Sequence, residues 1–284
     1  FKDPGSGNGV AVVGTVSGTS ISFGTPVVFF ASYIHDSAGI QATFDSNSNK
    51  VVITYNSYSP GALSRAIVGT VSGTSISLGT TVTWRSGYTY YHGITFDSTS
   101  NKVVIAYSLS SGLHPAYAIV GTVSGTTISF GTEVNWKSQA SDIGITYNSS
   151  GNKIAFIYSA YGTTGYPEAM VASVSGTTIT FEASVTQVYA YSTQYNIATY
   201  DSTADRVVLT HTGNSFYGRS SVFDTGGTNL TRWAGISTAA IADGAAGDIG
   251  ILGSVNSAQS SLTTNSYYYL QDDSTLSTTV VAGR

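Results

Sequence analysis

Hydrophobic and polar residues alternate along short stretches of this chain, with the period of two that half-buried β-strands show. Two such runs lie in VVGTVSGTSISFGTPVVF from Val12, on either side of a Ser-Gly turn whose glycine supplies the positive φ of a tight hairpin. A second hairpin is predicted over 40–55, with the turn DSNSN between its strands. No stretch shows a helical period with capping residues, so we expect an all-β protein.

Both hairpins recur along the chain, about one propeller blade's length apart. The later copies IVGTVSGTSISLGTTVTW and IVGTVSGTTISFGTEVNW match the first hairpin almost residue for residue. Four strands per repeat, joined in sequence by short turns, are typical of a β-propeller blade. We therefore predict a β-propeller-like array of four-stranded meander blades, with an open stack of β-meanders as the alternative. The first hairpin starts at Val12, Ile67, Ile119 and Met170, and the second at Ile40, Ile94, Ile145 and Ile197.

The repeats also predict two domains. A repeat domain takes residues 1–232, and a small C-terminal β module, richer in alanine, takes 233–284. Four blades are the lower limit of known propellers, so closure of a ring would need the opening strand or the fifth unit to complete another blade. Residues 1–9 occupy the place of a strand end and its loop, so we expect a longer parent chain. The units lie near 10–65, 66–117, 118–168 and 169–219, with a partial unit at 220–232.

The composition is that of a folded protein with few charges. Of 284 residues, 41% are hydrophobic and only 9% are charged, so hydroxyl and amide groups must supply the solubility. The net charge of −4, with 11 Lys plus Arg scattered singly, provides no basic stripe for nucleic acid. No apolar run approaches the ~20 residues that cross a bilayer, and the lack of cysteine excludes disulfides and thiolate metal sites. We therefore predict neither nucleic acid nor membrane as a partner.

The sequence contains no convincing catalytic or metal-binding motif. The turns DSNSN and DSTAD alternate oxygen ligands as a calcium loop does, but they lack its glycine and bidentate glutamate, so Asx hydrogen bonding explains them better. The four histidines fall in different units without ligand spacing, no arginine cluster is repeated, and no GxSxG elbow is present. We predict no metal, no cofactor and no enzyme activity. No spacing singles out a pair for glycoside cleavage among the carboxylates considered, Asp36, Asp142, Glu168 and Glu182.

Two loops in each repeat vary while the hairpins stay constant. Both loops leave a four-stranded meander at the same end, so we expect them to gather on one face of the array as a binding surface. Their tyrosines and tryptophans offer wide, rigid contact area that suits sugars or proteins; the alternative is that they cover blade ends or pack between blades. The first loop takes 30–36, 84–92, 136–142 and 189–195, and the second takes 56–65, 108–117, 159–168 and 212–219. The candidate binding residues are Tyr33, His35, Trp84, Arg85, Tyr88, Tyr90, Tyr91, His92, Trp136, Tyr191 and Tyr195.

The amino-acid sequence of the repeat resembles that of a known family. VGTVSGTSISFGTPVVF followed by FDSNSNKVVITY resembles the tandem-repeat tail-fibre or virion structural proteins of bacteriophages, especially marine and cyanobacterial phages. The segment AAIADGAAGDIGILGSVNSAQSSLTTNSYYYLQDDSTLSTT is similar to the short C-terminal module of such fibres. The resemblance covers almost the whole chain and carries no catalytic residues.

The resemblance implies a non-enzymatic virion appendage of the tail-fibre or receptor-binding type. Such a protein would lie in the virion, form a homo-oligomer, contact other virion proteins and attach its variable loops to a glycan or protein on the host surface. The alternative is a bacterial lectin or adhesin of the same architecture, secreted or held at the cell surface. A glycan depolymerase is the least supported reading, because no carboxylate constellation stands out.

Overall fold

A computed structural model of the chain divides into two compact units, Phe1–Thr225 and Gly226–Arg284. All regular secondary structure in the described residues is β-strand, which confirms the predicted all-β class. Within the same residues there is accordingly no helix long and apolar enough to span a membrane. The described residues are 1–35, 39–58, 61–109, 112–160, 165–188 (backbone alone over 183–187), 195–212 and 218–225, together with four two-residue strands in the second unit.

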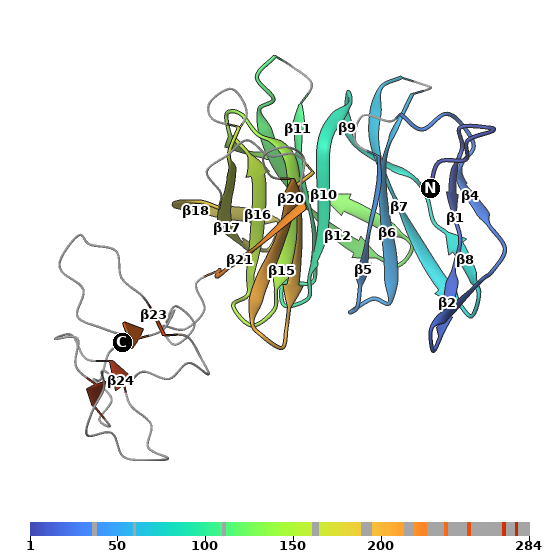
Figure 1. Cartoon of the computed structure of the whole chain (residues 1–284). Coiled ribbons are helices and arrows are strands. Elements are labelled where there is room, and N and C mark those ends of the chain that lie inside the picture. Colours follow the sequence, from blue (N-terminus) through green and yellow to red (C-terminus); the bar gives the residue numbers. More distant parts are fainter. Residues whose placement is uncertain are drawn as a thin grey trace. The chain divides into compact units, whose positions relative to one another are not determined.

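One sheet shows the plan of the first unit. β5 (Ile40–Asp45) pairs with β6 (Lys50–Ser57), which pairs in turn with the long β7 (Leu63–Ser72). The far edge of β7 binds two shorter strands end to end, β8 (Ser75–Leu78) and β9 (Val82–Ser86). The sheet is therefore a four-stranded antiparallel meander whose outermost strand is broken in two (Figure 1).

The same plan recurs on either side of this sheet. The first sheet holds the counterparts of β7, β8 and β9, with that of β7 split in two. Its strands are β1 (Gly9–Ala11), β2 (Gly14–Ser17), β3 (Ser20–Phe23) and β4 (Val27–Phe30). The later sheets are formed by β10 (Thr89–Asp97), β11 (Lys102–Leu109), β12 (Ala116–Ser124), β13 (Thr127–Phe130) and β14 (Val134–Lys137); by β15 (Ser141–Asn148), β16 (Lys153–Ser159), β17 (Pro167–Ser175) and β18 (Thr178–Gln187); and by β19 (Ile197–Asp201), β20 (Arg206–Thr212) and β21 (Gly218–Phe223). In the second unit, β22 (Ile236–Ser237) pairs with β23 (Ile249–Gly250), and β24 (Tyr269–Leu270) with β25 (Leu276–Ser277).

Each sheet joins the second hairpin of one sequence repeat to the first hairpin of the next. The pairing of β6 with β7 runs without interruption from Val51 opposite Gly69 to Ser57 opposite Leu63. The blade in space is thus offset by half a unit from the repeat in the sequence. Backbone hydrogen bonds as well as side-chain packing therefore connect each repeat to its successor.

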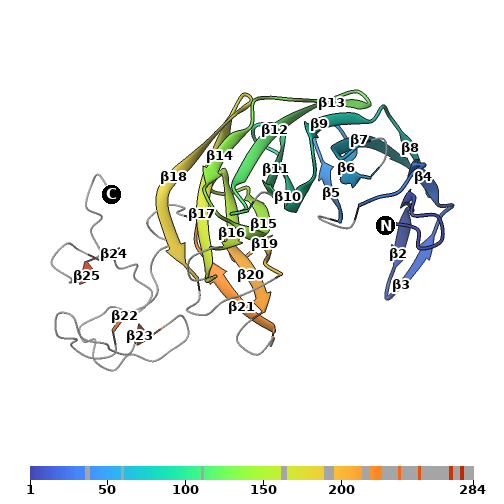
Figure 2. The same cartoon turned by 90° about the horizontal axis from the view of Figure 1, so that it is seen from above.

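The sheets of the first unit stand face to face with their first strands innermost. β5, β10, β15 and β19 lie next to one another, and Figure 2 shows the sheets following one another around an arc. Separate hydrophobic clusters occupy the spaces between neighbouring sheets. Val68 of β7 and Ile128 of β13 belong to one cluster, and Val120 of β12 and Ile179 of β18 belong to the next. This is the propeller-like array of four-stranded blades that the repeats predict.

The turns at the lower end of the sheets are Asx turns, as the sequence indicates. Asp45 Oδ1 accepts hydrogen bonds from the backbone N of Asn47 (3.0 Å) and Ser48 (2.9 Å). Asp97 repeats this geometry in the next sheet with Thr99 and Ser100. The carboxylate oxygens are thus used to hold the turn. The described residues contain no group of three His, Cys, Asp or Glu side chains placed to hold a metal ion.

Neighbouring sheets also touch through the glycines that follow the first hairpin in the first three repeats, where the fourth repeat has Glu182. A Cβ on Gly79 would lie 1.8 Å from the carbonyl oxygen of Thr126 in the next sheet, and one on Gly24 would lie 1.9 Å from that of Thr74. Only glycine lets the hairpin turn of one sheet rest on its neighbour at this distance. Glycine at this position of the first three repeats is therefore a packing requirement.

We expect Gly79→Ala to lower the free energy of unfolding by about 1–3 kcal/mol, because the two backbones must move apart to admit the methyl group. Chemical denaturation of both proteins measures the difference. Gly218→Ala is the matched control, since nothing lies within 4 Å of a Cβ at that position. Equal stability of the two variants would show that the contact between the sheets is loose.

Candidate functional site

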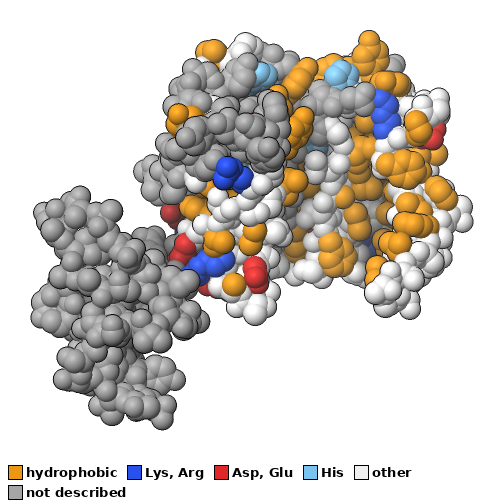
Figure 3. Space-filling view, viewed as in Figure 1, with side chains coloured by type: hydrophobic (Ala, Val, Ile, Leu, Met, Phe, Trp, Pro, Cys, Tyr) orange, Lys and Arg blue, Asp and Glu red, His pale blue; other side chains and the backbone are white. Residues whose placement is uncertain are grey.

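In the described residues, variable loops meet at one end of the sheets, as predicted, both within the first repeat and between the second and third. Backbone hydrogen bonds join them: Tyr58 N donates to Tyr33 O (3.0 Å), and His35 N donates to Asn56 O (2.9 Å). Two sheets further on, Ala140 N donates to the carbonyl oxygen of His114 (2.9 Å). Loops from distant parts of the sequence are therefore held side by side on the sheets. Histidine and hydrophobic side chains show along the upper edge of the molecule in Figure 3.

Trp84 and Trp136 were expected on the rim, but Trp136 is buried in the hydrophobic core and Trp84 is partly buried against the core. Trp136 is only 9% exposed, and its ring lies 5.0 Å from that of Tyr158 and 5.8 Å from that of Phe181. Trp84 packs 4.9 Å from Tyr107 in the same way. Both residues occupy the position that Phe29 takes in the first sheet, so their aromatic character serves the packing between strands.

Arg85 is held between two sheets by an ion pair. Its guanidinium donates to Glu133, which also accepts a hydrogen bond from the hydroxyl of Tyr107. Burial alone would raise the pKa of Glu133, but these two hydrogen bonds outweigh it and lower that pKa. Burial and the neighbouring carboxylate raise the pKa of Tyr107, so this phenol stays protonated. The guanidinium of Arg85 is therefore engaged in a contact between two sheets of the scaffold.

His92 is buried between sheets and stands below the rim. It is 3% exposed, and its Nε2 lies 3.2 Å from Thr54 Oγ1, while Nδ1 has no hydrogen-bond partner. Burial lowers the pKa of His92 from its ordinary value of 6.5 to about 4. Ile40 and Ile143 occupy the equivalent position in other repeats, so the neutral imidazole substitutes for a core side chain.

Four aromatic side chains from two neighbouring sheets form a group at the rim, which we call the rim aromatic group. The ring of His35 stacks on that of Tyr88 at 4.0 Å and lies parallel to that of Tyr58 at 5.9 Å. The Tyr33 ring meets Tyr58 edge-on at 6.0 Å. Tyr33 is 47% exposed and Tyr58 58% exposed, so the group offers aromatic surface to solvent.

Polar groups border the rim aromatic group. The ammonium of Lys2 lies 3.8 Å from the centre of the Tyr33 ring, a cation–π contact. Desolvation and the nearby hydroxyls of Tyr58 and Tyr90 raise the pKa of Tyr88. The group therefore joins stacked ring faces with hydrogen-bonding hydroxyls and one positive charge.

A second, smaller group lies at the next position along the rim. The ring of Tyr90 lies 6.3 Å from Tyr91 and 6.2 Å from His114, and Tyr91 meets His114 edge-on at 5.9 Å. Leu113, beside this histidine, is 60% exposed. Aromatic side chains therefore gather at two successive positions along the rim, but the residues differ from one pair of loops to the next.

A single backbone position near the rim takes the left-handed conformation in all four repeats. It is glycine in the first repeat (Gly39, φ 69°) and a bulkier residue in the others: Tyr91 (φ 46°), Asp142 (φ 50°) and Tyr195 (φ 56°). Non-glycine residues adopt this conformation at a cost of about 1–3 kcal/mol and gather at functional sites. The left-handed residues Tyr91, Asp142 and Tyr195 lie at the rim beside the aromatic groups.

Asp142 and Tyr195 form the third rim position. The backbone N of Tyr195 donates to Asp142 Oδ1 (3.2 Å), and the Tyr195 side chain is 69% exposed. Burial raises the pKa of Asp142 against the opposing effects of this hydrogen bond and of nearby His114. A carboxylate here lies next to an exposed ring, a combination that can accept hydroxyl hydrogen bonds and stack on an apolar face.

Other residues named as candidates from the sequence do not belong to these rim groups. Tyr191 and Asp36 lie outside the described residues. Glu168 pairs with Lys137 (2.7 Å) and accepts a hydrogen bond from Tyr158, and Glu182 pairs with Lys153 (3.0 Å), so neither carboxylate turns towards the rim groups. Tyr58, the ring that completes the rim aromatic group, was not among the candidate binding residues, and neither were His114 and Asp142. The place of Tyr58 in the second variable loop was the signal that could have identified it.

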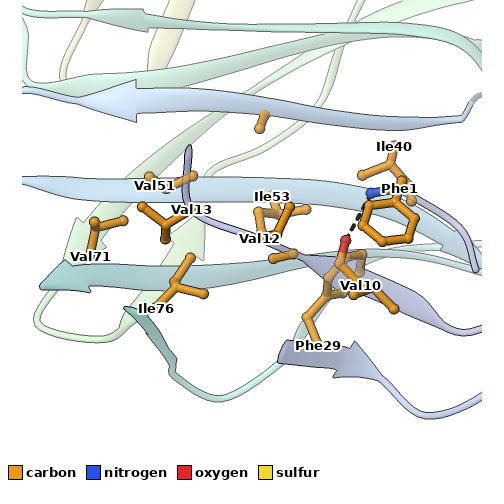
Figure 4. A pocket seen from close by; sticks show the side chains of 12 residues that line it. Phe1, Val10, Val12, Val13, Phe29, Ile40, Val51, Ile53, Val71 and Ile76 are labelled. Atoms are coloured by element: carbon orange, nitrogen blue, oxygen red, sulfur yellow. Dashed lines mark hydrogen bonds between the residues drawn. The ribbon is translucent and has the colours of Figure 1, made fainter. Parts of the chain in front are cut away.

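A cavity between the first two sheets does not belong to the site. It has a volume of about 360 Å³ and lies between β1–β4 and β5–β8 (Figure 4). The side chains of Phe1, Phe29, Ile40 and Ile53 are among those that line it, and every lining residue is hydrophobic. Ligand sites need a few polar groups that fix orientation, and this cavity offers only the backbone beside the Phe1 N to Val10 O hydrogen bond of 2.8 Å.

No protein-family model matches the chain, and no curated protein sequence matches it. Among solved structures, a variant of Aleuria aurantia lectin in complex with Fucalpha1-6GlcNAc has a TM-score of 0.40 and 13% identity, covering 80% of this chain and 82% of that chain. A variant of the same lectin in complex with alpha-methyl-L-fucoside has a TM-score of 0.39 and 12% identity, covering 78% and 80%. These values are too low to transfer a site or a ligand.

The burial of His92 makes stability depend on pH. Its folded pKa of about 4 lies below its unfolded value of 6.5, so the unfolded chain binds the proton first and stability falls as the pH drops from 6.5 towards 4. We expect His92→Ile, which copies Ile40 and Ile143, to gain about 2 kcal/mol over the wild type on going from pH 7.5 to pH 5. Denaturant titrations at the two pH values measure this difference.

His92→Asn copies Asn196, the residue of the fourth repeat, and should show the same reduced dependence on pH. If all three proteins lose stability in parallel on acidification, the buried imidazole is not the titrating group.

Proposed function

We propose that this chain is a non-catalytic carbohydrate-binding protein whose sites lie on the rim, between neighbouring sheets. The observation that supports this most is the rim aromatic group of Tyr33, His35, Tyr58 and Tyr88, where stacked rings from two sheets are exposed to solvent. Sugars present apolar C–H faces and a border of hydroxyls. The exposed tyrosine side chains, bordered by phenol, imidazole and ammonium groups, match both parts of that surface.

The stacking also reduces the entropy lost on binding. His35 is stacked on Tyr88, and Tyr33 contacts both Tyr58 and Lys2, so these side chains are largely held in place before a ligand arrives. A preorganised site loses less free energy on ordering its side chains than a mobile one. The backbone hydrogen bonds between the loops of Tyr33 and Tyr58 fix the same geometry.

A binding role without catalysis agrees with the chemistry of the carboxylates. Retaining and inverting glycosidases need two carboxyl groups facing one bond. Within the described residues, Glu168 and Glu182 are engaged in ion pairs, and Asp142 stands at the rim with its backbone partner Tyr195. The proposal therefore includes no bond cleavage.

The biological setting that we propose is attachment of a phage virion to a host-surface glycan. Its support is the resemblance of the repeats to virion tail-fibre proteins, with a secreted or surface-bound bacterial lectin as the alternative setting. Mass spectrometry of purified virions and of the culture supernatant distinguishes the two. Recovery in the supernatant alone would favour the lectin.

We expect Tyr58→Ala to weaken binding to a glycan-array hit about tenfold, or about 1.4 kcal/mol, because it removes an exposed ring and the support of His35. Tyr33→Ala should act in the same direction. Biolayer interferometry against the immobilised glycan measures both effects.

Phe44→Ala is the matched control, because this 53% exposed ring lies in β5 at the opposite end of the sheet, beside Asp45. Binding that is lost equally in the control and the two rim variants would move the site away from the rim. A wild-type protein that binds no glycan would overturn the carbohydrate proposal.

A further inference from the structure

A network of buried polar side chains lies next to the rim aromatic group. It joins Asn56 of β6, Ser64 of β7 and Thr89 of β10, each of which is 0% exposed. Asn56 Oδ1 accepts hydrogen bonds from Ser64 Oγ (2.8 Å) and Thr89 Oγ1 (3.2 Å), and Asn56 Nδ2 donates to the carbonyl oxygen of Thr89 (2.7 Å). Because β10 begins the next sheet, this polar network connects two neighbouring sheets.

The polar network holds the backbone on both sides of Tyr88. This tyrosine lies on the two-residue connection between β9 and β10. Before it, the carbonyl oxygen of Gly87 lies 3.1 Å from Ser64 Oγ, which donates to it. After it, the carbonyl oxygen of Thr89 accepts the hydrogen bond from the amide of Asn56. The position of the Tyr88 ring is therefore set by side chains of the preceding sheet.

Asn56 also holds the ring that stacks on Tyr88. Its backbone carbonyl accepts a hydrogen bond from the backbone N of His35 (2.9 Å), and the His35 ring stacks on Tyr88 at 4.0 Å. One residue thus binds both halves of the stack, His35 through its main chain and the connection that carries Tyr88 through its side chain.

The later sheets cannot form the same network. Asn56 stands opposite Ser64 across β6 and β7, and the residue in the place of Ser64 is alanine, proline or glycine in the later sheets, none of which has a side-chain hydroxyl or amide. Those sheets form without the network, so the fold does not require it. The equivalent pairs are Ser108 with Ala116, Ser159 with Pro167 and Thr212 with Gly218.

We propose that Asn56 and Ser64 are positioning residues that hold the His35–Tyr88 stack in the geometry that binds ligand. Burying polar side chains costs desolvation free energy, which their hydrogen bonds return only in part. A fully bonded network makes its surroundings rigid, and here it is placed at the stack. This inference rests on the proposed carbohydrate function for the identity of the ligand, but the positioning of the rings can be tested without one.

The first test observes the stack in the free protein by NMR. The chain has four histidines, so a proton–carbon correlation spectrum contains few imidazole signals, and loss of one in His35→Gln identifies that of His35. The ring current of Tyr88 shifts this signal, and Tyr88→Leu gives its unstacked position. We expect Asn56→Ser and Ser64→Ala, which copy the pair of the following sheet, each to move the His35 signal towards the unstacked position.

Thr54→Val is the matched control. Thr54 lies two residues before Asn56 on the same strand, and its Oγ1 lies 3.2 Å from Nε2 of His92 in β10, so the variant also removes a polar contact between the two sheets. The His35 signal should stay in place. A shift as large as that in Asn56→Ser would indicate a general loosening between the sheets and would overturn the proposal. An unchanged His35 signal in both network variants would overturn it as well.

The second test measures the dissociation constant for a glycan-array hit. We expect Asn56→Ser to raise it about fivefold, because the rings must then be ordered during binding, and Thr54→Val to leave it unchanged. Ser64→Ala removes a single hydroxyl and carries both tests if the larger change at Asn56 prevents folding.

The two tests separate this inference from the proposed function. A His35 signal that moves while the dissociation constant stays the same would reject the role of Asn56 and Ser64 in binding and leave the carbohydrate proposal standing. A wild type that binds no glycan would remove the carbohydrate proposal, and the NMR signal of His35 would then decide by itself whether the network positions the stack.

Discussion

The packing of one sheet on the next is the interaction on which the rest of this structure depends. A sheet such as β5–β9 has hydrophobic residues on both faces, with Val52 and Val68 directed to one neighbour and Ile53 and Ile67 to the other. A sheet of this kind cannot bury both faces by itself, so it is stable only between neighbours. With 9% charged residues in the chain, this burial and the hydrogen bonds between strands supply most of the stability.

The same constraint separates the scaffold from the surface that can change. Core positions accept few alternatives, and even aromatic residues of the segments predicted as variable loops pack there, as Trp84 of β9 and Trp136 of β14 show. Side chains in the loops beyond the ends of the strands do not have to fill the core. Tyr33 and Tyr58 can therefore project from one pair of loops while Asp142 and Tyr195 occupy a later one. Strain at the left-handed residues is tolerated because the hairpins below hold the backbone in place.

Much of the fold could be predicted from the sequence, and less of the candidate site. Alternation and turn chemistry placed the hairpins and the Asx turns, because both depend on neighbours in sequence. The offset between repeat and blade was missed, since it depends on which hairpins pair across a loop. Arg85 and His92 fall in a segment predicted as a variable loop, but the structure places them in β9 and β10 with their side chains turned inwards, which the composition of the segment does not reveal. Tyr58 was overlooked for the converse reason, as one aromatic residue in a loop of small polar ones.

The amino-acid sequence by itself determined the strands, their turns, the repeat and the end of the sheets at which the variable loops gather. These follow from local rules: the period of two, the positive φ of glycine and asparagine, and the direction in which a meander leaves a sheet. Tertiary structure alone decided that the rings of His35, Tyr58 and Tyr88 stack, that Trp136 is buried, and that the side chains of Arg85 and His92 turn inwards. Which way a side chain turns depends on the neighbouring sheet that it meets, and that neighbour is set by the arrangement of the whole array.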